Sequence, residues 1–202
     1  MVPRRSAMGT GPVSGFTGGD GGRRERIPAA GRAGVDDVIE GPSSGLTVLT
    51  VLTVLGALGT GLVAGVFCAF STFVMRGLAA LPPARGVAAM QSVNAAAVRA
   101  PFMLVFLGSA LLCAAIAVVT SVRWPDEGAV GLLVGSALYL FGGFGITVAA
   151  NVPRNDVLAG LAPDTAEASA YWTAYVREWT LWNHVRTAAS AGAALSYVLA
   201  LT

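Results

Sequence analysis

The polar residues best suited to chemistry lie just before the last apolar stretch of the chain. The segment WTLWNHVRTAAS, residues 179–190, contains Asn183, His184 and Arg186, and His184 is the only histidine in the sequence. An imidazole can exchange a proton near neutral pH, and a guanidinium can stabilise a developing negative charge. The segment is therefore a candidate for proton abstraction beside an oxyanion. The alternative is that His184 is a hydrogen-bonded structural residue.

A second polar group, NVPRND at residues 151–156, follows another apolar stretch. Pro153 disfavours helical geometry at Val152, so we expect the helix to break there. In the structural interpretation, the amides of Asn151 and Asn155 satisfy the backbone groups that this break frees. In the functional interpretation, the broken end holds polar side chains against the start of the last helix: Asn151, Arg154 and Asp156.

The composition indicates a membrane protein. Of the 202 residues, 54% are hydrophobic and 12% are charged, whereas a soluble domain has about 25% charged residues. A net charge of +2 gives no reason to expect a nucleic-acid partner. Cys68 and Cys113 lie inside apolar runs and are expected to be packing residues. With two cysteines and one histidine, we expect no metal site.

Four apolar runs are predicted to cross a bilayer, since about 20 residues are enough for one span. The expected fold is therefore all-α, an integral membrane bundle of four transmembrane helices. We expect this bundle to lie in a bacterial plasma membrane. Residues 1–45 are rich in Gly and Arg and are predicted to form a disordered tail. The membrane domain is residues 46–202, with spans at about 46–75, 101–122, 129–150 and 183–202.

The last helix is expected to begin outside the membrane. The sequence PDTAE predicts a start with Asp164 as N-cap and Glu167 as its partner. No proline or glycine follows before Ser190, so the helix should run into the membrane unbroken. One stripe of this helix is either an interfacial aromatic belt with a snorkelling arginine or the aromatic wall of a ligand site. The stripe consists of Trp172, Tyr175, Trp179, Trp182 and Arg186.

The order of the spans predicts which polar groups share one end of the bundle. In four sequential antiparallel spans, the first and the third connections emerge on the same side. Asn183 and Arg186 also share a helix face, whereas His184 lies about 100° around the helix from Asn183. The polar residues expected at this common end are Arg76, Asn94, Arg99, Asn151, Arg154, Asn155, Asp156, Arg177, Asn183, His184 and Arg186.

Residues 55–200 resemble the DUF1772 membrane proteins, also called the anthrone oxygenase family. The most specific parts of the resemblance are the N-x-P-x-N-D turn and the later W-x-x-W-N-x-x-R segment. The resemblance implies a four-helix integral membrane protein. Some members are associated with anthrone oxidation without metal or flavin. The positions that match the family pattern are Asn94, Arg99, Asn151, Asn155, Trp179, Trp182, Asn183 and Arg186.

Oxidation of an anthrone by dioxygen without a cofactor requires a base, oxyanion donors and a dry site. We expect His184 to be the base, with Asp156 as the alternative, and we expect Arg186, Arg99 and the asparagine amides to form the oxyanion site. The expected partners are the lipid bilayer, a planar hydrophobic substrate and dioxygen. The residues expected to bind the substrate are Asn94, Arg99, Asn151, Asn155, Trp179, Trp182 and Asn183.

A non-enzymatic interpretation stays open. The same asparagines and arginines could lock helix ends together in a small membrane scaffold or binding protein. Stability separates the two interpretations, because functional polar groups often reduce stability whereas a lock increases it.

Overall fold

The computed structural model describes residues 11, 15, 42–125 and 127–202, and every regular element among them is a helix. This confirms the predicted all-α fold for the described part of the chain. The elements are α2 (Pro42–Ala69), the π-helical η1 (Phe70–Val74), α3 (Met75–Ala79), α4 (Pro83–Ala97), α5 (Ala100–Arg123), α6 (Ala129–Ala137), the π-helical η2 (Leu138–Gly145) and η3 (Thr147–Asn151), α7 (Val152–Ala159) and α8 (Ala166–Leu199).

Three described helical stretches are long and apolar enough to cross a membrane: Thr47–Ala79, Pro101–Arg123 and Ala129–Ala159. They correspond to the first three predicted spans. The fourth predicted span, residues 183–202, is not among them, because Asn183, His184 and Arg186 lower its mean hydropathy. Its crossing stays a prediction. Many large side chains on the outside of the bundle are leucine or valine, as expected for a surface in contact with lipid.

The predicted tail differs from the structure at its boundary. Residues 42–45 belong to α2, so the helix begins earlier than the apolar run alone indicated. Apart from residues 11 and 15, the tail before residue 42 lies outside the described residues, and its predicted disorder is untested.

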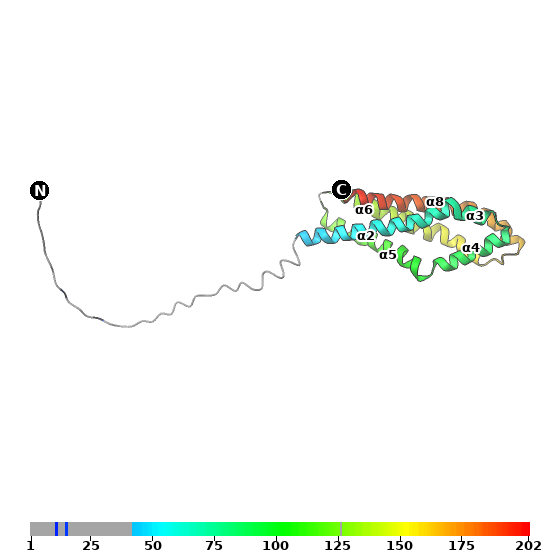
Figure 1. Cartoon of the computed structure of the whole chain (residues 1–202), viewed down its shortest axis with the longest axis horizontal. Coiled ribbons are helices and arrows are strands. Elements are labelled where there is room, and N and C mark those ends of the chain that lie inside the picture. Colours follow the sequence, from blue (N-terminus) through cyan, green and yellow to red (C-terminus); the bar gives the residue numbers. More distant parts are fainter. Residues whose placement is uncertain (1–10, 12–14, 16–41, 126) are drawn as a thin grey trace.

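The described helices form long rods, namely α2–η1–α3, α5, α6–η2–η3–α7 and α8, and these four rods share an apolar core (Figure 1). Helix α8 packs against α2 on one side and against α6 and η2 on the other, and α5 contacts both α2 and α6. Buried side chains from all four rods meet in this core, including Val63, Phe106, Leu132 and Tyr197. Close approach needs small residues. A Cβ on Gly142, for example, would lie 2.5 Å from the Cβ of Ala189 on α8.

Helix α4 covers the aromatic stripe at the other end of α8. Gln91 on α4 donates hydrogen bonds to the carbonyls of Leu158 in α7 (2.8 Å) and of Leu161 in the connection between α7 and α8 (2.9 Å). The α3–α4 turn and the α7–α8 connection therefore lie at the same end of the bundle, as the topology predicted, and the C-terminus lies at the opposite end.

The helix break expected at Pro153 is wrong. Val152 has φ −60° and ψ −49°, and the helix continues to Ala159. Pro153 occupies the first turn of α7, which follows the π-helical η3, and proline is tolerated in a first turn. The Arg154 guanidinium also donates to the carbonyl of Ala150 at 2.7 Å, so this backbone acceptor is satisfied.

Helix α8 runs without interruption over 34 residues, as predicted, but its N-cap is Thr165 and not Asp164. Thr165 has extended backbone geometry, and its hydroxyl accepts a hydrogen bond from the Ala168 N–H at 3.2 Å. Glu167 lies in the first turn, where the helix dipole favours an acidic residue.

Candidate functional site

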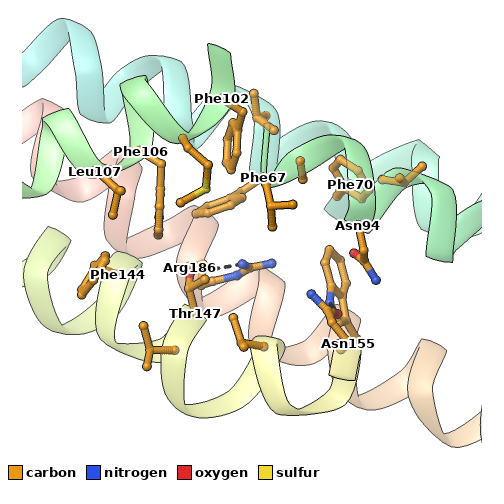
Figure 2. Close-up of a pocket in the computed structure, with 18 of the residues that line it drawn as sticks. Phe67, Phe70, Asn94, Phe102, Phe106, Leu107, Phe144, Thr147, Asn155 and Arg186 are labelled. Carbon is orange, nitrogen blue, oxygen red and sulfur yellow. Dashed lines mark hydrogen bonds between the residues drawn. The ribbon is translucent and has the colours of Figure 1, made fainter. Parts of the chain in front are cut away.

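A cavity of about 350 Å³ lies between α8, the α4–α5 corner, the end of α2 with η1, and η2–η3 (Figure 2). This volume falls within the ~300–1,000 Å³ typical of small-molecule sites. Most of its lining is apolar, and the polar side chains on its wall are Asn94, Thr147, Asn155 and Arg186. The arrangement suits a ligand that is mainly hydrophobic and carries a few oxygen atoms.

Aromatic rings form one side of the cavity. Phe102 and Phe106 are stacked, with ring centroids 5.7 Å apart and 13° between their planes. Phe144 lies 5.5 Å from Phe106, and Phe67 meets both Phe102 and Phe106 edge to face. These flat surfaces come from three different rods and favour a flat aromatic ligand.

Arg186 lies against these rings in a buried position, with 4% of its surface exposed. Its Nη1 donates to Thr147 Oγ1 at 3.2 Å, and its Nη2 donates to Asn183 Oδ1 at 2.6 Å. Its Cζ lies 4.2 Å from the centroid of the Phe67 ring and 5.0 Å from that of Trp179. Figure 2 shows the guanidinium between Phe67 and the helix that carries Thr147.

No carboxylate among the described residues pairs with Arg186, and its Nε has no hydrogen-bond partner there. Its partners are neutral oxygens and aromatic faces. A buried charge is costly unless an opposite charge or several hydrogen bonds compensate it. The guanidinium therefore presents an uncompensated positive charge to an apolar cavity, where an anionic oxygen would be strongly attracted.

Asn183 holds Arg186 in place. Asn183 Nδ2 donates to the carbonyl of Phe67 and to Ser71 Oγ, both at 2.7 Å, while its Oδ1 accepts from Arg186. Ser71 belongs to the π-helical η1, and Thr147 begins the π-helical η3. Arg186 is thus anchored at two positions where the neighbouring helices depart from α-geometry, a feature that is frequent at functional sites.

A second hydrogen-bonded group lies on the α4 side of the cavity. Asn155 Oδ1 accepts from the Tyr175 hydroxyl at 2.8 Å and from Trp179 Nε1 at 2.9 Å. Asn94 Nδ2 donates to the Tyr175 oxygen at 3.5 Å. Burial raises the pKa of Tyr175, so it stays a neutral phenol and a donor at neutral pH. Because two donors occupy Asn155 Oδ1, the remaining polar group of this side chain is its Nδ2 donor.

Two predicted polar residues near the cavity act as braces. Asn151 is buried, and its Nδ2 donates to the carbonyl of Trp179 at 3.2 Å. Arg154 forms an ion pair with Glu178 at 2.9 Å. Both contacts join the η3–α7 segment to α8, and neither side chain lines the cavity.

The structure brings together only some of the predicted site residues. Asn94, Asn155, Trp179 and Arg186 line the cavity, and Asn151 and Asn183 support it from behind. The other four predicted residues do not line it: Arg99, Asp156, Trp182 and His184.

Both predicted bases, His184 and Asp156, are exposed and lie outside the cavity. His184 points away because it lies about 100° from Asn183 around the helix. Among the described residues, no Asp, Glu or His lines the cavity, and no group of three or more His, Cys, Asp or Glu side chains is placed to hold a metal ion.

Sequence reasoning missed the phenylalanine wall and Thr147. The phenylalanines looked like ordinary apolar residues of a span. The only available signal was that Phe102 and Phe106 are four residues apart and therefore share a helix face. Nothing in the sequence indicated that Phe67 and Phe144 would face the same space.

One known protein family matches part of the chain. The family model described as "Anthrone oxygenase" matches residues 102–196, from the start of α5 almost to the end of α8. The matched region includes Phe102, Thr147, Asn155 and Arg186, whereas Phe67 and Asn94 precede it. Comparisons with curated proteins and with solved structures found no match.

Proposed function

We propose that the chain, whose residues 102–196 match the anthrone oxygenase family model, oxidises a planar aromatic ketone with dioxygen inside the membrane. The reaction converts a ring methylene next to the aromatic system into a carbonyl, with water as the second product. The observation that carries this proposal is the buried, uncompensated guanidinium of Arg186 against an aromatic cavity wall.

Arg186 would act on the ionised form of the substrate. Loss of a methylene proton from such a ketone moves an electron pair onto the ketone oxygen and gives an enolate. A fixed cation in a low-dielectric site stabilises that charge more than water does. Asn155 Nδ2 and Asn94 are the neutral donors on the same cavity wall, and they suit further oxygen atoms on the substrate.

The remaining steps need only dioxygen and a proton. The enolate transfers an electron to dioxygen, and the two radicals combine at the former methylene carbon to give a peroxide anion, which takes up a proton. Loss of the second hydrogen from that carbon then cleaves the O–O bond, releases water and leaves the new carbonyl. One substrate molecule and one dioxygen molecule give one quinone and one water.

In this proposal the first proton passes to bulk solvent at the polar end of the bundle, on the α4 side of the cavity. The lining offers no carboxylate or imidazole among the described residues. Arg186 therefore contributes by increasing the fraction of substrate that is ionised, and not by taking the proton.

The cavity opens toward the apolar outer surface. Val98, Leu107, Val148 and Val152 all line the cavity and are also exposed on the outside of the bundle. The opening lies between the α4–α5 corner and the η3–α7 segment. We propose that α8 completes a four-helix membrane bundle, so that this opening faces lipid and admits both dioxygen and a hydrophobic substrate.

The proposal is tested with membranes that contain the full chain. Emodin anthrone is added, and quinone absorbance is followed under air and under argon. The expected result is a protein-dependent rate that disappears under argon. A rate no greater than that of membranes without the protein would reject the proposal for this substrate.

A non-enzymatic helix lock is the second candidate, and one observation favours it. Arg186 and Asn183 connect α8 to η1, to η3 and to the Phe67 carbonyl. A lock predicts that loss of Arg186 lowers the melting temperature strongly. The oxygenase proposal predicts little loss, because replacing an uncompensated buried charge by an apolar side chain is often neutral or stabilising.

A further inference from the structure

A second pocket, of about 410 Å³, lies between α8 and the η1–α3 segment. It does not share Arg186 or the phenylalanine wall with the cavity described above. Three nitrogen-rich side chains line it, namely Arg76, Arg177 and His184. The other lining residues are Ser71, Met75, Ala79, Val176, Thr180 and Leu181.

The pocket has a strong positive bias. Among the described residues, no Asp or Glu lines it. Arg177 has one ionic contact, with Glu178 at 3.7 Å, and 80% of its side chain is exposed, so this pair is weak. Arg76 forms no ion pair with a described residue. Both guanidinium groups are therefore available to an anion.

Thr180, which also lines the pocket, carries a hydroxyl that can act as a further donor. The hydroxyl oxygen of Thr180 is buried and has no hydrogen-bond partner among the described residues. A buried polar group without a partner is costly, so a group that accepts this hydrogen bond would be favoured. His184 also carries a ring N–H in either protonation state. Two guanidinium groups, an imidazole N–H and a hydroxyl thus line one pocket.

The pocket lies at the level where the apolar surface meets the polar end of the bundle. Arg76 follows the last residue of the predicted first span, and His184 is the second residue of the predicted fourth span. Leu181 and Val185 form an exposed apolar strip beside it on α8. Basic pockets between membrane helices at this depth are suited to anionic lipid headgroups.

We propose that this pocket binds a phosphate group, with Arg76 and Arg177 pairing with its oxygens and His184 and Thr180 donating to it. The group can belong to an anionic phospholipid or to a small phosphorylated solute. The proposal does not depend on oxygenase activity. It also gives a role to His184, which the oxidation chemistry does not use.

The test measures thermal stability of the purified full chain by tryptophan fluorescence in detergent. Three titrations are compared, namely short-chain phosphatidylglycerol, short-chain phosphatidylcholine and inorganic phosphate. The double variant Arg76→Gln/Arg177→Gln removes both cations, and Thr180→Val removes the hydroxyl donor. Arg85→Gln is the matched control, because Arg85 is an exposed arginine on α4 that does not line the pocket.

The wild-type protein and Arg85→Gln should be stabilised by phosphatidylglycerol and not by phosphatidylcholine. The double variant should bind phosphatidylglycerol at least about tenfold more weakly, since charged hydrogen bonds are lost. An equal response to inorganic phosphate would identify a soluble phosphate as the ligand and would also support the site. The proposal is overturned if neither phosphatidylglycerol nor inorganic phosphate stabilises the wild-type protein. It is also overturned if the double variant responds to these two probes as the wild-type protein does.

Discussion

Asn183 and Arg186, one turn apart on α8, form the shortest side-chain contact at the cavity, with 2.6 Å between Asn183 Oδ1 and Arg186 Nη2. The same asparagine donates to the Phe67 carbonyl on α2 and to Ser71 Oγ on η1. Asn183 therefore links the guanidinium to the neighbouring rod, and the position of the charge depends on it.

The variant Asn183→Ala should lose both stability and activity. The Arg186 Nη2 would be left buried without the hydrogen bond that it donates to Asn183, at a cost of about 1–3 kcal/mol. The free energy of unfolding, measured in mixed detergent micelles, should fall by that order. Ser92→Ala is the control, because Ser92 is exposed and its hydroxyl bonds only within α4. Equal stability of the two variants would contradict this role for Asn183.

The variant Thr147→Asp should reduce activity without unfolding the protein. Thr147 Oγ1 already accepts from Arg186 Nη1, so a carboxylate there would give the guanidinium an internal counterion. The site would then attract an enolate less. We expect kcat/KM for emodin anthrone to fall by about 100-fold, the order seen when one oxyanion donor is lost.

Thr147→Asn is the matched control, since it changes the size in a similar way without adding charge. It should retain much more activity than Thr147→Asp. Similar losses in both variants would show that shape, and not the charge of Arg186, limits the reaction.

The variant Val148→Trp should slow substrate entry. Val148 is 52% exposed and lines the cavity on its lipid-facing side, so a large side chain there narrows the opening. KM should rise while kcat changes little, because the reacting groups are untouched. Val130→Trp, on the exposed surface of α6 away from the cavity, is the control and should leave both constants unchanged. An unchanged KM in Val148→Trp would argue for entry by another route.

The variant Phe106→Ala should be strongly destabilised. Phe106 is buried, stacks on Phe102 and accepts the Tyr139 hydroxyl hydrogen bond at its carbonyl. Truncation of a buried phenylalanine costs about 3–5 kcal/mol. Phe106→Leu keeps most of the volume and should cost much less. Comparable unfolding free energies for the two variants would show that the wall does not contribute to the packed core.

Helix α8 shows how much of the site could be predicted from sequence. Its uninterrupted run as far as Ser190 followed from the absence of proline and glycine there, and the shared face of Asn183 and Arg186 followed from their spacing. Trp172, Tyr175 and Trp179 of the predicted stripe are all buried, as expected for residues that share one face of the helix. These features depend on one helix alone, and periodicity reports on one helix well.

Features that depend on contacts between helices could not be predicted in this way. His184 is next to Asn183 in the sequence but lines the second pocket and not the cavity of Arg186. The faces of α2 and η3 that meet Arg186 depend on helix rotation and on the π-helical segments, which no residue pattern revealed. The helix also continues through Pro153, which lies in the first turn of α7 directly after the π-helical η3.

The most direct test of the central claim is the rate of dioxygen-dependent emodin anthrone oxidation by Arg186→Met, measured together with its melting temperature. We predict that kcat/KM falls by about 100- to 1,000-fold, because the oxyanion partner is lost, while the melting temperature stays equal or rises. An undiminished rate in Arg186→Met, or a strongly lowered melting temperature with a normal rate in the folded fraction, would contradict the account and favour the helix lock.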